Sequence, residues 1–236
     1  MSALLAAEGL HAFYGAIHVL HGVDLSIRRG ETVALMGRNG MGKTTLLRTL
    51  MGLVRQRRGR VLLGERDMSD APPETIARGG VAFVPEGRGI FASLTVTENL
   101  VMAARLAPDG RRSWTLERIF ELFPRLAERR HHWGNQLSGG EQQMLTIGRA
   151  LMTNPDLILI DEAAEGLAPM VAQTIWQTLL AIRAEGVAAL VVDKDFRALS
   201  RLADRVLLMA KGEFVFSGTP MELCADYELL EKHLGI

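Results

Sequence analysis

Short apolar segments alternate with helix-like segments along most of the chain. Four apolar runs flanked by glycine, proline or charged residues are candidates for buried strands: Thr32–Met36, Val81–Val84, Leu157–Ile160 and Val187–Val192. Two further strands are expected on either side of a short turn, at Arg205–Met209 and Glu213–Phe216. Strands that alternate with helices pair mostly in parallel, so the pattern predicts an α/β domain.

The middle of the chain has a helical pattern instead, from about Thr97 to Arg130. Apolar side chains there recur at the spacing of one helix face, at Ile119, Phe120, Phe123 and Leu126. No strand pattern interrupts this segment. We therefore expect a helical subdomain at residues 90–136, inserted into an α/β core formed by residues 1–89 and 137–236.

The composition fits a folded globular chain, with 48% hydrophobic and 23% charged residues among 236. The formal net charge is +0, and nucleic-acid-binding proteins usually carry a basic surplus, so no nucleic-acid partner is expected. The single Cys224 fits a reducing compartment. No apolar stretch approaches the ~18–20 residues of a membrane helix, and the first residues lack the basic start of a signal peptide. We expect a cytosolic chain that reaches a membrane only through a partner.

The segment Gly37–Thr44 fits the phosphate-loop pattern G-x-x-x-x-G-K-[ST]. It follows an apolar strand and precedes a helix expected at Lys43–Met51, an order that a chance glycine-rich turn would not need. Backbone N–H groups and the helix N-terminus attract phosphate, Lys43 suits the β- and γ-phosphates of ATP, and Thr44 suits Mg²⁺. The expected nucleotide-binding residues are Gly37, Arg38, Asn39, Gly40, Met41, Gly42, Lys43, Thr44 and Thr45.

Two acids, Asp161 and Glu162, end the apolar run at Leu157–Ile160. Parallel sheets place their chemistry at the carboxyl ends of strands. Asp161 suits the Mg²⁺ shell, and Glu162 suits orienting or deprotonating the water that attacks ATP. Such acids often merely cap the next helix, but the phosphate loop favours the catalytic interpretation.

The segment Leu137–Gln143 reads LSGGEQQ and precedes another helix. Ser138 and Glu141 have the spacing of a capping box, which is the purely structural interpretation. A cap does not require Gly139 and Gly140, which weaken the first turn and leave its N–H groups open to an anion. The segment resembles the signature of ATP-binding-cassette (ABC) ATPases. In that family the signature of one subunit, here Ser138, Gly139 and Gly140, closes over the γ-phosphate held by the other.

The resemblance covers nearly the whole chain. Tyr14 matches the aromatic residue that stacks on adenine, although a half-buried strand tyrosine would look the same. Gly166–Pro169 resembles the loop that crosses between the two subunits. Phe83–Arg88 and Glu121–Leu126 are similar to the short cassettes of branched-chain amino-acid importers, a pattern that urea and short-amide importers share.

The resemblance implies a P-loop NTPase core with a mostly parallel sheet, an N-terminal antiparallel β portion and an inserted helical subdomain. It also implies ATP and Mg²⁺ as cofactors, a second cassette, homologous or identical, and transmembrane permease subunits that receive substrate from a periplasmic binding protein. The expected location is the cytoplasmic face of the membrane. Substrate and direction stay open, because selectivity resides in other chains.

Three departures from the family pattern concern the catalytic centre. Many cassettes have glutamine where this chain has Glu86, most have histidine where it has Lys194, and Ala163–Glu165 replaces the usual Pro-Ser-Leu or Pro-Thr-Glu. The resemblance places Glu86 and Lys194 near the γ-phosphate and Mg²⁺, with Glu86 as a further Mg²⁺ ligand. We expect Lys194 to pair with Glu86 before the dimer closes and with the γ-phosphate afterwards. The alternative is a Lys194 that points into solvent.

Other classes of function lack the sequence features they require. A cassette acting on DNA or ribosomes would need a coiled-coil insertion or a second cassette in tandem, and a P-loop kinase or GTPase has no use for Leu137–Gln143. A short exporter cassette remains open. The six histidines show no metal-ligand spacing, and the arginines between Arg55 and Arg60 form either a solvated turn or a contact with lipid headgroups or a membrane subunit.

Overall fold

The computed structural model describes residues 3–235, in which the main sheet has six strands in the order β10-β9-β3-β8-β7-β6. All neighbours pair in parallel except β9 and β10, which form a hairpin. The strands are β3 (Thr32–Met36), β6 (Val81–Val84), β7 (Leu157–Asp161), β8 (Ala188–Val192), β9 (Arg205–Ala210) and β10 (Glu213–Gly218). All six strands predicted from the apolar runs are confirmed. Every residue of β3, β7 and β8 is buried, as expected for strands covered on both faces.

A second, antiparallel sheet has the order β2-β1-β4-β5 and confirms the expected N-terminal β portion. Its strands are β1 (Ala3–Tyr14), β2 (Ile17–Arg28), β4 (Gln56–Leu63) and β5 (Arg66–Asp67). The residue pattern alone did not define these strands. In β1 the alternation of buried and exposed residues breaks at Gly9, which has a φ of 53° and lies within a shift of register against both neighbouring strands.

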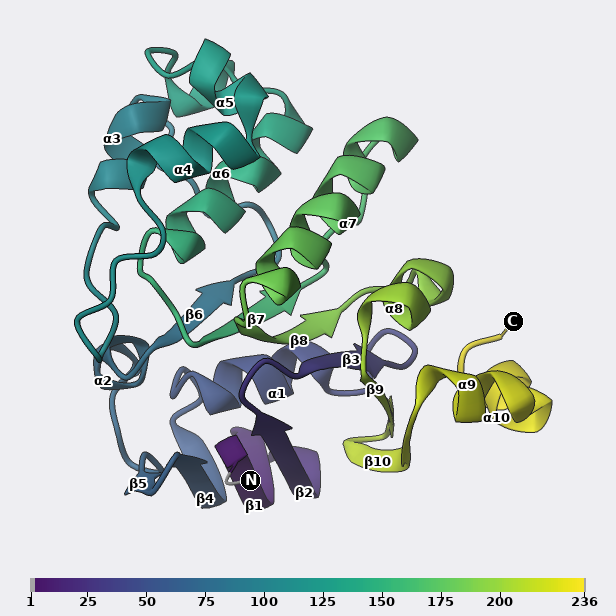
Figure 1. Ribbon diagram of the computed structural model, residues 1–236. Coiled ribbons are helices and arrows are strands. Elements are labelled where there is room, and N and C mark those ends of the chain that lie inside the picture. Colours follow the sequence, from purple (N-terminus) through teal and green to yellow (C-terminus); the bar gives the residue numbers. More distant parts are fainter. Residues whose placement is uncertain (1–2, 236) are drawn as a thin grey trace.

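Helix α1 (Lys43–Leu50) lies between the two sheets, and α7 (Pro169–Ala184) and α8 (Phe196–Leu202) cover the opposite face of the main sheet (Figure 1). Leu46, Leu47 and Leu50 of α1 are fully buried in one core cluster with both sheets. The predicted helix is confirmed to within one residue, and Gly52 after its end has the positive φ of a helix-terminating glycine, 73°. This packing fixes the start of α1 against the end of β3.

Further helices form a layer above the main sheet (Figure 1). They are α3 (Val96–Val101), α4 (Leu116–Leu122), α5 (Pro124–Glu128), the 3₁₀ turn η1 (Gly134–Gln136) and α6 (Gly139–Leu151). Ile119, Phe123 and Leu126 are buried on one face, as predicted, and pack with α6 in one cluster. The expected helical run is interrupted at residues 102–115, where Pro108 and Gly110 interrupt the helical sequence.

The remaining helices lie outside these layers: α2 (Pro73–Arg78) precedes β6, and α9 (Pro220–Ala225) and α10 (Tyr227–His233) follow β10. No helix within residues 3–235 has the length and apolar character needed to cross a bilayer.

Candidate nucleotide site

The phosphate loop connects β3 to α1 through glycines in backbone conformations that other residues rarely adopt. Gly37, Gly40 and Gly42 have φ values of 142°, 78° and 106°. At Gly37 a Cβ atom would also overlap the carbonyl oxygen of Met209 in β9. The loop can therefore follow this path only with glycine at its first position.

Lys43 begins α1 and bends back over the loop. Its Nζ donates to the carbonyl oxygens of Gly37 and Arg38, at 2.7 and 2.9 Å. Burial lowers the pKa of Lys43, and the charges of Glu162 and Asp161 oppose that shift. The helix has no side-chain cap and no acid in its first turn, so its first N–H groups remain suited to an anion.

A cavity of about 290 Å³ opens beside this loop. Its lining consists of Val19, Asn39, Gly40, Gly42, Lys43, Thr44, Thr45, Glu86 and Glu162. Gly37, Arg38 and Lys194 line a neighbouring cavity of about 230 Å³, which shares Asn39 with the first. The structure thus brings most of the predicted site residues together. Met41 and Tyr14 line neither cavity, and Tyr14 is 46% exposed at the end of β1.

Asp161 is buried at the end of β7, and neither of its carboxylate oxygens has a hydrogen-bond partner within residues 3–235. Burial raises the pKa of Asp161, and the nearby Thr44 hydroxyl partly offsets this rise. The contact between Thr44 and Asp161 does not have the geometry of a full hydrogen bond. An unpartnered carboxylate beside a hydroxyl fits a hard cation such as Mg²⁺. No three His, Cys, Asp or Glu side chains in the described chain form a metal cage of their own. Mg²⁺ typically takes one or two carboxylates and completes its shell with substrate phosphates.

Glu162 follows directly, with a φ of 56° that is unusual for a residue with a side chain. Its N–H donates to the carbonyl oxygen of Val192 at 2.9 Å, which holds it in place. A hydrogen bond shared with Glu165 raises the pKa of Glu162 to about 7, with burial and the charge of Glu165 adding to the rise. A carboxyl group that titrates near neutrality suits general-base chemistry.

Lys194 follows β8, and its ammonium forms an ion pair with Glu165. The expectation that Lys194 pairs with Glu86 is therefore wrong for this structure. Asp193 explains why Lys194 lies next to Glu165. Its carboxylate accepts from the N–H groups of Ala164 (3.0 Å) and Lys194 (2.7 Å) and so joins the loops after β7 and β8. The sequence marks Glu165 as part of the departure at Ala163–Glu165 but does not identify it as the partner of Lys194, and no sequence pattern predicts the role of Asp193.

Ser138 caps α6 in the capping box that its spacing predicts. Its hydroxyl accepts from the N–H of Glu141 at 3.4 Å, and its own N–H donates to the Glu141 carboxylate at 2.8 Å. Gly139 and Gly140 form the first turn; a Cβ atom on Gly140 would overlap the side chain of Val171, and one on Gly139 would displace the end of the flexible Arg88 side chain. None of the three residues lines the nucleotide cavity: α6 belongs to the upper helical layer and α1 to the lower part of the molecule (Figure 1).

The site combines a phosphate loop and its lysine with a buried aspartate at a strand end. Next to the aspartate lies a glutamate whose pKa is near 7. Together these groups define an ATP-hydrolysing P-loop cassette. The family model described as ABC transporter matches residues 20–165. The chain belongs to the ABC transporter family, whose cassettes are ATPases coupled to transport.

Relatives and solved structures agree with this assignment. The chain is 38% identical to the high-affinity branched-chain amino acid transport ATP-binding protein BraG of Pseudomonas aeruginosa, over 98% of this chain and 100% of that one. It is 33% identical to the lipopolysaccharide export system ATP-binding protein LptB of Haemophilus influenzae, over 98% and 97%. A nucleotide-free ATP-binding cassette of an ABC transporter matches 100% of the chain and 99% of its own, with a TM-score of 0.84 and 26% identity. A dimeric cassette in a post-hydrolysis state, bound to ADP and Pi, matches 92% and 98%, with a TM-score of 0.77 and 27% identity.

Proposed function

We propose that this chain is the ATPase subunit of an importer for branched-chain or other hydrophobic amino acids. The observation that carries the proposal is the similarity to BraG along the whole of both chains. The LptB relative at 33% identity makes an exporter of envelope lipid the main alternative, and urea or amide import is a third.

In the proposed reaction Lys43 exchanges its two loop carbonyls for oxygens of the β- and γ-phosphates, and the free N–H groups of the loop and α1 bind the remaining oxygens. Thr44, Asp161 and Glu86 would hold Mg²⁺, which when bound neutralises charge on the phosphates. Glu162, as a carboxylate, accepts the proton of the attacking water. Tyr14, at the exposed end of β1, is placed against adenine in this proposal.

A second cassette would complete the site. Ser138, Gly139 and Gly140 line no part of this chain's own nucleotide cavity. In the proposed dimer they cover the γ-phosphate of ATP bound to the partner, which explains why a capped helix start retains two glycines. The dimeric relative shows that this family fold pairs with another cassette.

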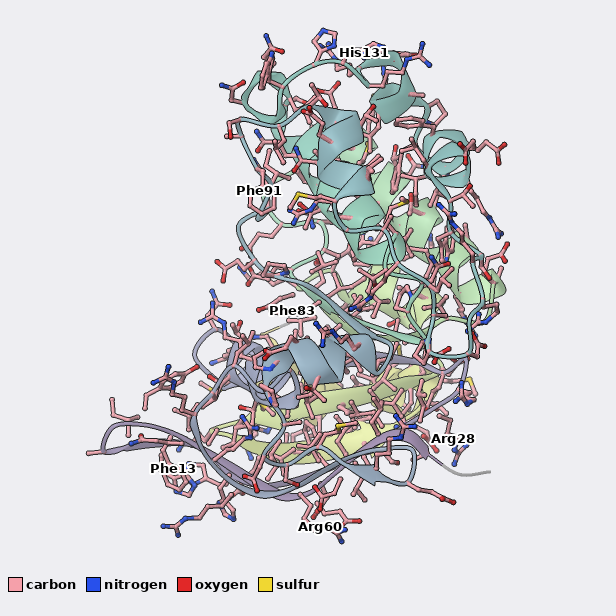
Figure 2. The ribbon with its side chains drawn as sticks, turned by 90° about the vertical axis from the view of Figure 1, so that its left-hand side faces the viewer. Phe13, Arg28, Arg60, Phe83, Phe91 and His131 are labelled. Atoms are coloured by element: carbon pink, nitrogen blue, oxygen red, sulfur yellow. The ribbon has the colours of Figure 1, made fainter. Side chains whose placement is uncertain are left out.

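A permease contact is proposed at a third cavity, of about 310 Å³, between the loop after β6 and α6. Phe83 and Pro85 line it, and Arg149 lies over the Phe91 ring at 4.7 Å. Figure 2 shows Phe83 at the level where helices meet sheets and Phe91 above it, beside the helices. The loop that lines this cavity also carries Glu86, so a permease bound here, at the cytoplasmic face of the membrane, would touch a segment that reaches the nucleotide.

The test is co-purification of the tagged chain from its native membranes, with identification of the permease and any periplasmic binding protein. An importer predicts both, and uptake of labelled leucine or valine should be lost with Lys43→Ala. Phe83→Ser should lower permease recovery several-fold while ATP binding stays unchanged, and the matched control Phe13→Ser, in the distant antiparallel sheet (Figure 2), should not. Recovery of lipopolysaccharide-transport subunits instead would contradict import.

A further inference from the structure

The ion pair between Glu165 and Lys194 lies beside the proposed γ-phosphate position. Glu165 shares a hydrogen bond with Glu162, the base that would face the attacking water, and it also pairs with the ammonium of Lys194. Both charges also act on the phosphate-loop lysine: Lys194 lowers the pKa of Lys43 and Glu165 raises it. The ammonium of Lys194 is thus separated from the catalytic base by one side chain.

The backbone under this pair is fixed more firmly than the pair itself. Asp193 is 7% exposed and holds Ala164 and Lys194 through their N–H groups, so the two loops cannot separate easily. The side chains of Lys194 and Glu165, by contrast, are 50% and 40% exposed. An ion pair this exposed is weak and can be exchanged for a stronger partner.

The charge balance of the cavity identifies that partner. Among the cavity-lining residues of the described chain, Lys43 is the one cation, facing Glu86 and Glu162. MgATP remains anionic after the charge of its metal ion is counted, so its terminal phosphate favours a further cation beside Lys43. Lys194, in the adjoining cavity with Arg38 and Asn39, is the lysine already next to Glu162.

We propose that Glu165 is a positioning residue that holds Lys194 beside Glu162 and competes with the terminal phosphate of ATP for its ammonium. ATP breaks the pair and ADP, which lacks that phosphate, does not. The strength of the Glu165–Lys194 pair therefore sets part of this chain's preference for ATP over ADP. The inference rests on the proposed binding of MgATP in this cavity.

The experiment measures MgATP and MgADP affinity by displacement of a fluorescent nucleotide from the full chain. All variants carry Glu162→Gln, which slows turnover strongly and removes the carboxylate that shares a hydrogen bond with Glu165. Adding Glu165→Gln should tighten MgATP binding about two- to five-fold, the range for loss of one exposed competing ion pair, with MgADP unchanged. Glu165→Asp, which restores the charge, should return the ATP/ADP ratio toward that of the parent.

Two further variants test whether Lys194 carries the effect. With Lys194→Gln also present, Glu165→Gln should no longer alter the ratio. Glu8→Gln, which breaks the exposed Arg60–Glu8 pair in the antiparallel sheet, is the matched control and should leave it unchanged. An unaltered ratio in Glu165→Gln, or an equal gain without Lys194, would overturn the inference alone. Failure of the Glu162→Gln parent to bind MgATP at all would overturn the proposed function as well.

Discussion

The backbone of Glu162 stores strain at the point where the chemistry is proposed. A left-handed conformation costs a residue with a side chain of order 1–3 kcal/mol and persists only when its surroundings enforce it. Here the Val192 carbonyl binds the N–H of Glu162, and Asp193 anchors Ala164 two residues later. This backbone conformation places Glu162 at the cavity that Lys43 and Thr44 line.

Glu162→Gln should retain MgATP binding but lower kcat by about 10²–10⁴-fold, because an amide cannot accept the water's proton. Below pH 7 Glu162 of the free protein holds its proton, so kcat/KM of the native chain should fall as the pH drops through about 7. That acid limb should be absent from the residual activity of the variant. Measurements of steady-state ATPase rates from pH 5.5 to 9 check both points, and near-normal turnover by Glu162→Gln would exclude its role as base.

The sequence was sufficient to predict the strand–loop–helix unit around Gly37–Thr44 and the position of Asp161 at a strand end, because both depend on local sequence. It was insufficient for the partner of Lys194. Glu86, Glu162 and Glu165 all follow strands that end at the same sheet edge, and Asp193 decides among them by tying two loops together. Contacts between loops far apart in sequence leave no periodic pattern.

At the scale of elements, predictability followed burial. Strands β3, β7 and β8 are buried on both faces and read as unbroken apolar runs, whereas β4 carries a run of arginines on an edge-like surface. There Arg57 donates to the carbonyls of Val54 and Ser69, and Arg60 pairs with Glu8 and Asp67. At least part of the basic run is therefore held in contacts with the antiparallel sheet and the loops beside it, which a charge pattern alone does not reveal.

The start of α6 provides a stability prediction. A Cβ on Gly140 would overlap the branched side chain of Val171 in α7, whereas on Gly139 it would meet only the mobile end of Arg88. Overpacking costs about 1–3 kcal/mol and alanine returns at most about 1 kcal/mol of helix propensity. Gly140→Ala should therefore lower the free energy of unfolding by up to about 2 kcal/mol, and Gly139→Ala should leave it unchanged or raised. Urea titration compares the two, and equal effects would contradict the packing argument.

At the scale of the whole molecule, the two proposed halves of the shared nucleotide site lie on different layers of the chain. Helix α1, which follows the phosphate loop, lies between the sheets, and α6, which follows Ser138, lies in the helical layer above them (Figure 1). A symmetric dimer contacts through the same surfaces on both copies, so two half-sites on one chain would become two complete sites in a pair. The fold alone does not identify the transported molecule. The nucleotide cavity is built from the shared P-loop architecture, and the transported molecule would contact only the permease.

Mixing two inactive chains tests this shared site. Lys43→Ala removes the phosphate-loop cation, and Gly139→Asp places a negative charge on the signature beside Arg88, whose guanidinium can pair with it so that the chain still folds. If Lys43 and Gly139 serve the same nucleotide from opposite chains, each mixed dimer has one doubly damaged and one intact site. Random pairing of equal amounts should then restore up to about a quarter of the native ATPase rate.

The control is a mixture of two differently tagged Lys43→Ala preparations, which has no intact site in any pairing and should stay inactive. If both residues instead served a nucleotide within one chain, every site in the mixture would carry a defect and no activity would return. Pull-down through one tag, assayed for the other, establishes that mixed dimers have formed.

Where the native partner is a different cassette, the test uses the assembled transporter. The two changes are divided between its two cassette subunits, and the ATPase rate is compared with that of a transporter carrying both changes in one subunit. If the site is shared, dividing the changes so that they meet at the same nucleotide leaves the other site untouched. Combining both changes in one subunit then damages both sites. Equal ATPase rates for the two arrangements would contradict a site shared between subunits.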